Sequence, residues 1–127
     1  MREELVAEMK AFISAHGGCN TFRPIAYYDK HMDCIRVQLF DCSFIEERQN
    51  KILTVLKSNH DGEGKLAGFN IKGVRHVFLQ LGIPFSGVYA ITFLLDKIVA
   101  LYPDKALREA QNHFGPILGA EALEVAM

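Results

Sequence analysis

The segment Leu66–Tyr102 constrains the fold most, because its hydrophobic pattern changes from that of a strand to that of a helix within a few residues. Leu66–Ile71 is short, mostly apolar and bounded by glycine-containing turns, which predicts a buried strand. Val74–Leu81 then has apolar residues at the spacing of one helix face, and Gly82 is suited to end that helix in the left-handed conformation. A strand followed closely by a helix is therefore expected at the centre of the fold.

A longer helix is predicted over Gly87–Tyr102, with Ser86 as its N-cap and Pro103 immediately after its end. Apolar residues occupy more than one face of this segment, and few polar residues interrupt them. Because one domain has a limited interior, the surplus apolar surface predicts a homodimer formed through Gly87–Tyr102.

The other elements are predicted from local patterns. Helices are expected over Arg2–Ala15, from Ser43 to about Ser58 and from Asp104 to about Phe114, and strands over Phe22–Tyr28 and Asp33–Phe40. Pro24 near its start makes the first strand an edge strand, and a hairpin is expected to join it to the second. The helix at Ser43 is predicted from a capping box, in which Ser43 is followed three residues later by Glu46.

These elements give the order αββαβααα. Since a helix separates the second strand from the third, those two strands are expected to be parallel and joined by a right-handed crossover. The predicted fold is α/β, with α+β as the alternative: a small mixed three-stranded sheet with one βαβ crossover, covered by about five helices. The chain shows no repeat or linker, so residues 1–127 are expected to form a single domain with a loosely docked tail at 117–127.

Composition excludes several classes of function. Half of the 127 residues are apolar and the net charge is −1, which predicts a folded domain with no basic excess for nucleic acid or for an anionic membrane. No apolar run is long enough to span a bilayer, and the N-terminus does not resemble a signal peptide. Three cysteines without a C-x-x-C spacing fit a reducing compartment, so a cytoplasmic protein is predicted.

Parallel strands would bring the residues after both strand ends to one edge of the sheet, where α/β folds hold their ligands. That edge would present backbone N–H groups at the start of the Gly73 helix together with basic side chains, which predicts a site for a small anion. The expected ligand-binding residues are Ser43, Asn70, Lys72, Gly73 and Arg75. The alternative interpretations are an ordinary solvated helix face and a site for a protein partner.

The same edge would place Cys42 near His76, and this pair is the candidate for a small thiol- or histidine-dependent enzyme. Against catalysis, free cysteine is among the most buried residue types, and Glu46 near the thiol would raise its pKa. Whether the chain is an enzyme is left open, and no cofactor motif is found.

Two further classes of site are disfavoured. Cys34 and Cys42 lie too far apart along an extended strand to share one ion with His31, so no metal site is predicted. Val74–Leu95 fits the outline of a helix-turn-helix, but Phe78 is too bulky for its tight crossing and the would-be recognition helix lacks base-reading side chains. DNA binding is therefore only a less favoured alternative.

Overall fold

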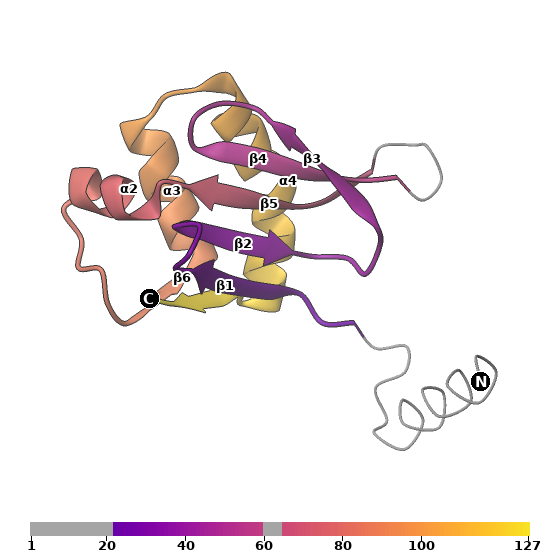
Figure 1. The fold of residues 1–127 in the computed structure, drawn as a ribbon, viewed down its shortest axis with the longest axis horizontal. Coiled ribbons are helices and arrows are strands. Elements are labelled where there is room, and N and C mark those ends of the chain that lie inside the picture. Colours follow the sequence, from indigo (N-terminus) through magenta and orange to yellow (C-terminus); the bar gives the residue numbers. More distant parts are fainter. Residues whose placement is uncertain (1–21, 60–64) are drawn as a thin grey trace, which may run out of the picture.

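The computed structural model describes residues 22–59 and 65–127 of the chain. The helix predicted over Arg2–Ala15 lies outside the described residues. Within them the architecture is α+β, with a five-stranded antiparallel sheet, a two-stranded sheet and three helices (Figure 1).

The large sheet has the spatial order β1-β2-β5-β4-β3, and every neighbouring pair is antiparallel. Its strands are β1 (Ile25–Asp29), β2 (Cys34–Gln38), β3 (Phe44–Arg48), β4 (Leu53–Ser58) and β5 (Leu66–Lys72). The predicted hairpin of the first two strands is confirmed, with β1 at an edge, and β5 is the strand predicted at Leu66–Ile71.

The predicted α/β fold, with three strands, a parallel crossover and about five helices, is wrong. β2 pairs with β5 in antiparallel register, Ile35 opposite Ile71 and Val37 opposite Phe69. The segment predicted as a helix after Ser43 is the β3–β4 hairpin, which inserts two further strands beside β5.

The turn of the β3–β4 hairpin shows why the capping-box pattern failed. The side-chain oxygen of Asn50 accepts the backbone N–H groups of Ile52 at 2.8 Å and Leu53 at 2.7 Å, which closes the turn. Leu53–Leu56 is then buried between β3 and β5. Pairing with β5 satisfies the backbone of the segment and buries its apolar side chains, which outweighs a local helix signal.

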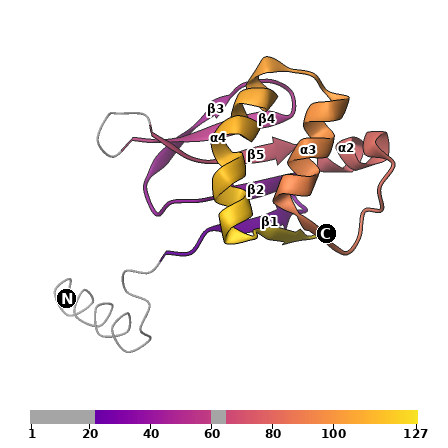
Figure 2. The ribbon, with the colours of Figure 1, turned by 180° about the vertical axis from the view of Figure 1, so that it is seen from behind.

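Three helices follow the sheet: α2 (Val74–Leu81), α3 (Ile91–Leu101) and α4 (Lys105–Glu121). Figures 1 and 2 show α3 and α4 packed across one face of the sheet, with α2 at the end of β5. α2 ends at Gly82, in the left-handed conformation as predicted, and α4 begins at the predicted N-cap Asp104.

Helices α3 and α4 differ from the prediction. Residues 88–90 form β6 (Val88–Ala90), which pairs with β7 (Glu124–Ala126), so α3 begins at Ile91 rather than after Ser86. α4 continues through Pro116, where a helix end was expected, because Phe114 and Leu118 on its inner face are both buried in the core.

The core lies between the sheet and these helices. The inward side chains of β2, β4 and β5 meet those of α2, α3 and α4, and Phe69 of β5 packs on Phe114 of α4 with 4.9 Å between ring centres. The other face of the sheet, called the open face below, is covered by no helix among residues 22–59 and 65–127 (Figure 1).

Candidate functional site

A cavity of about 500 Å³ lies where β5 ends, and we call it the Lys72 cleft. Its walls come from the β3–β4 turn, the start of α2 and the α3–α4 junction. The lining residues are Asn50, Lys51, Ile52, Lys72, Gly73, His76, Val77, Tyr102, Pro103, Asp104 and Leu107. A cavity of this size falls within the usual range for small-molecule sites.

Hydrogen bonds between distant parts of the chain fix the rim of the cleft. The amide of Asn50 donates to the carboxylate of Asp104 at 3.0 Å, and the same oxygen of Asp104 caps α4 by accepting the N–H groups of Ala106 and Leu107. The backbone N–H of Lys72 donates to the carbonyl of Ile52 at 2.6 Å. The turn, the strand end and the helix start are thus held together before any ligand arrives.

The charge of the cleft is positive, in contrast to that of the whole chain. Two lysines, Lys51 and Lys72, stand against one acidic residue, Asp104, which gives +1 when His76 is neutral, whereas the whole chain has a net charge of −1. Lys51 and His76 are exposed and Lys72 is half-buried. The two lysines come from different elements, the β3–β4 turn and the end of β5, and both line the same cavity.

Tyr102 supplies the most unusual group of the cleft. Its hydroxyl is buried and has no hydrogen-bond partner in the described part of the chain. A buried hydroxyl without a partner costs free energy, and most such groups in native proteins find a partner in the protein, in water or in a ligand. Tyr102 lines the cleft, and its hydroxyl could therefore donate a hydrogen bond to an acceptor on a bound ligand.

The start of α2, which the sequence nominates as an anion site, is already occupied by a carboxylate of the chain itself. Asp33 accepts the backbone N–H of Arg75 with both side-chain oxygens, at 3.2 and 3.4 Å, and its carbonyl accepts the N–H of Val74. Tyr28 donates its hydroxyl to the same carboxylate at 2.7 Å. These two N–H groups are therefore not available to an external anion.

Arg75 is turned away from the cleft by this arrangement. Its guanidinium lies 3.5 Å from the Tyr28 hydroxyl, 4.0 Å from the Asp33 carboxylate and over the ring of Phe85. The hydrogen bond with Tyr28 is the main reason why the pKa of Arg75 is raised above its ordinary value. Of the five predicted ligand-binding residues, only Lys72 and Gly73 line the cleft, where they are joined by the predicted His76.

The other nominated residues lie elsewhere. Ser43 is in the β2–β3 connection, and Asn70 is on the open face of β5. Cys42 lines a small cavity with Leu66 and Ala67 at the beginning of β5, whereas His76 follows the end of that strand. The antiparallel sheet therefore does not bring Cys42 and His76 together, and the enzyme hypothesis loses the shared edge on which it depended.

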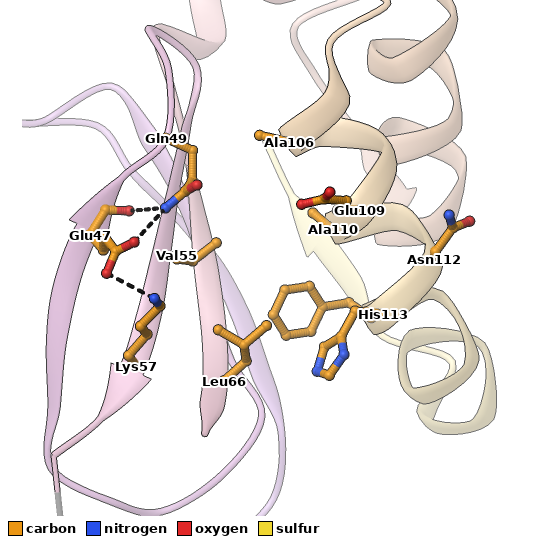
Figure 3. Close-up of a pocket in the computed structure, with 11 residues that line it drawn as sticks. Glu47, Gln49, Val55, Lys57, Leu66, Ala106, Glu109, Ala110, Asn112 and His113 are labelled. Atoms are coloured by element: carbon orange, nitrogen blue, oxygen red, sulfur yellow. Dashed lines mark hydrogen bonds and ion pairs between the residues drawn. The ribbon is translucent and has the colours of Figure 1, made fainter. Parts of the chain in front are cut away.

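A second, larger cavity of about 660 Å³ lies between the β3–β4 hairpin and α4 (Figure 3). Its hairpin wall carries Glu47, Gln49 and Lys57, and its floor is apolar. Lys57 lies 2.9 Å from the carboxylate of Glu47, to which Gln49 also donates at 3.2 Å, and the Lys57 contact is the main reason why the pKa of Glu47 is lowered. The polar groups of this wall already have partners, so the Lys72 cleft is the better candidate.

Two further features were sought among the described residues, a group of metal ligands and a membrane-spanning helix. Within residues 22–59 and 65–127, no three His, Cys, Asp or Glu side chains gather closely enough to hold a metal ion. No helix in the same ranges has both the length and the apolar character needed to cross a membrane.

Comparisons of the chain with protein-family models, with curated proteins and with solved structures found no match. Function is therefore inferred from the geometry and chemistry of the site.

Several residues of the cleft were missed by sequence reasoning. Asp104 was recognised only as a helix cap, and Asn50 and Tyr102 were not nominated. Asn50 and Lys51 precede an apolar run that contains a β-branched residue. Asn is a common turn residue, so this pattern could have indicated that Asn50 and Lys51 form the turn of a hairpin. No local signal reveals the contact between Asn50 and Asp104, which lie 54 positions apart.

Proposed function

We propose that the chain is a binding protein for a small organic anion and that the Lys72 cleft is its site. The anionic group, a carboxylate or a phosphate, is held by Lys51, Lys72 and the hydroxyl of Tyr102. The apolar body of the ligand lies against Val77 and Leu107. The observation that carries the proposal is the buried, unpartnered hydroxyl of Tyr102 in the lining of a positively charged cavity.

Charge and cavity size set the expected affinity. An exposed lysine contributes little to binding because water and salt screen its charge, so an inorganic anion should bind at roughly millimolar Kd. An anion with an aromatic body should bind more tightly, because burying the ring in the cleft removes apolar surface from water. The proposal includes the cytoplasmic location that the cysteine pattern predicts, because small organic anions are present in the cytoplasm.

The experiment is a titration of the labelled full-length chain, followed by NMR, with inorganic phosphate and with phenyl phosphate. We expect amide shifts centred on Ile52, Gly73 and Tyr102, with phenyl phosphate the tighter ligand. The double variant Lys51→Gln, Lys72→Gln should lose both responses. Lys97→Gln, which removes one positive charge from the exposed surface of α3 outside the cleft, should keep them. Shifts absent from the cleft, or unchanged in the double variant, would refute the proposal.

A homodimer is a second proposal, favoured by a specific observation. Val88, Phe93 and Leu101, all within the segment 87–102, are 61%, 40% and 41% exposed. A second copy would cover this apolar surface through a symmetric contact. Light scattering at tens of micromolar should then give twice the mass of 14.3 kDa, and Phe93→Glu should return the protein to a monomer. A monomer in the unmodified chain would exclude the dimer.

A further inference from the structure

The open face of the large sheet carries a second polar constellation, unrelated to the Lys72 cleft. One row of residues crosses all five strands in register: Tyr27, Arg36, Asn70, Thr54 and Arg48. The row ends in Tyr27 on β1 and in Arg48 on β3, and its most buried members, Asn70 and Thr54, lie between these ends. Such a surface is suited to bind a flat, polar molecule against the sheet.

A notch lies beside this row, next to Asn70. It is a cavity of about 140 Å³ lined by Tyr27, Arg36, Val37, Gln38, Phe44, Leu56 and Asn70. Gly68 stands between Gln38 and Leu56 in register, and a Cβ atom at this position would collide with the carbonyl oxygen of Val37, so glycine is required there. A cavity of about 150 Å³ is known to hold a benzene molecule, so the notch has the volume for one six-membered ring.

Asn70 supplies hydrogen-bonding capacity that the protein does not use. Its side chain is 2% exposed, its amide nitrogen donates to Glu46 at 3.3 Å, and its carbonyl oxygen has no partner among the described residues. A carboxamide has two N–H protons and one carbonyl oxygen, so one donor and one acceptor remain side by side. Thr54, opposite Asn70 on β4, is 1% exposed and its hydroxyl also lacks a partner in those residues.

Arg36 forms another wall of the notch and is held in place by two carboxylates. Its guanidinium lies 3.2 Å from Asp29 and 3.6 Å from Glu46. A guanidinium has five N–H donors, so these two contacts leave others for a carbonyl oxygen in the notch. Tyr27 from one edge strand and Phe44 from the other supply aromatic walls.

We propose that the notch beside Asn70 binds a pyrimidine ring that carries an imide edge, as uracil does. The ring N–H donates to the free carbonyl oxygen of Asn70, and an adjacent ring carbonyl accepts from the amide of Asn70 or from Arg36. This cyclic pairing of a carboxamide with a base edge resembles the way Asn reads bases in nucleic acids. Tyr27 and Phe44 contact the ring itself.

The free base or nucleoside is favoured over a nucleic acid strand. Binding a strand depends on neutralising phosphates, yet the positive charge of Arg36 is shared with Asp29 and Glu46, and the whole chain has a net charge of −1. A single ring in a notch requires no such basic surface.

The test is an NMR titration of the labelled full-length chain with uridine, with N3-methyluridine and with a six-residue oligouridylate. We expect uridine to shift the amides of Arg36, Gln38 and Asn70. N3-methyluridine, which lacks the imide proton, should bind at least tenfold more weakly. The oligouridylate should bind no more tightly than its six rings predict statistically, with little dependence on salt.

Variants separate the notch from the rest of the fold. Tyr27→Leu should weaken uridine binding at least fivefold, because stacking on the exposed ring is lost. Ile25→Ala, a truncation at the next outward position of β1 and outside the notch, should have no effect. Asn70→Asp, which exchanges the amide donor for a carboxylate, should abolish binding while keeping the side-chain shape.

Several outcomes would overturn the proposal. Absence of shifts at these amides would exclude the site, and equal binding of N3-methyluridine would exclude the hydrogen bond to Asn70. Much tighter, salt-dependent binding of the oligouridylate would support the ring site and overturn its assignment to free nucleosides. None of these results bears on the Lys72 cleft, whose residues are separate.

Discussion

Replacing Tyr102 by Phe removes a single oxygen atom, and the structure predicts opposite effects on stability and on ligand binding. The hydroxyl is buried without a partner in the described residues, whereas in the unfolded chain water would bond to it. Burying an unpaired hydroxyl costs about 1 to 3 kcal/mol in mutational data. Because the ring of Phe packs in the same way, Tyr102→Phe should raise the free energy of unfolding by about 1 to 2 kcal/mol.

The effect is large enough to measure by urea or thermal unfolding without ligand. For a chain of this size, a gain of 1 kcal/mol corresponds to a rise in Tm of roughly 3 to 5 °C. Tyr89→Phe is the matched control, because the hydroxyl of Tyr89 donates to the carbonyl of Pro84 at 2.6 Å. Removing that paired hydroxyl should leave stability unchanged or lower it.

The same substitution, Tyr102→Phe, should weaken ligand binding although it stabilises the free protein. If the hydroxyl of Tyr102 donates to the anion, its loss should weaken the binding of phenyl phosphate about tenfold or more, since a hydrogen bond to a charged group contributes about 1.5 to 3 kcal/mol. A variant that is less stable than the original would show that the hydroxyl is already bonded in solution. Unchanged binding would show that Tyr102 does not contact the ligand, and either result would refute the reasoning.

Three further predictions concern the fold. Asp33→Ala should lower the free energy of unfolding by about 1 to 2 kcal/mol, because it removes the carboxylate that caps the start of α2. Asp33→Asn should lower it less, because the amide oxygen can still accept the N–H of Arg75. Urea unfolding of the two variants measures the difference. Pro116→Ala should raise Tm in a thermal scan, with a gain of up to about 3 kcal/mol, because it restores an N–H donor inside α4. The pKa of Asp29 is lowered chiefly by the backbone N–H of Met32 and also by Arg36. This stabilising contribution is present above the unfolded-state pKa, near about 4, and is lost as pH falls through the folded-state value, so Asp29→Asn should flatten the decline of the urea midpoint in acid.

The sequence predicted the fold where local signals and tertiary packing agree. β5 and α2 are examples, because the apolar run, the change of period and Gly82 all indicate the same boundaries. The β3–β4 hairpin is the counterexample. Ser43 and Glu46 match a capping box, yet Glu46 instead accepts a hydrogen bond from Asn70 on β5 and pairs with Arg36 on β2, two strands that lie beyond β4 in the sheet. Only the sheet partners decide between these uses of one side chain.

The candidate site was predictable to a similar degree. Lys72, Gly73 and His76 are close in sequence and remain together in the cleft. Arg75 was nominated by the same argument, but Asp33, which lies 42 positions away, holds the helix start on which its role depended. Tyr102 entered the sequence argument only as the end of an apolar helix. Its importance comes from the absence of a hydrogen-bond partner in the described residues, which no sequence pattern reveals.

The strand order β1-β2-β5-β4-β3 also has a consequence for how the chain folds. The pairs β1–β2, β3–β4 and β4–β5 join neighbours along the chain, and they form quickly because short loops close at little entropic cost. Within the large sheet, the β2–β5 pair is the one that joins strands about 30 to 40 residues apart, and it unites the two halves of that sheet. We expect this seam to form in the rate-limiting step, so that substitutions at Val37 or Ile71 slow refolding, while those in β3 mainly accelerate unfolding.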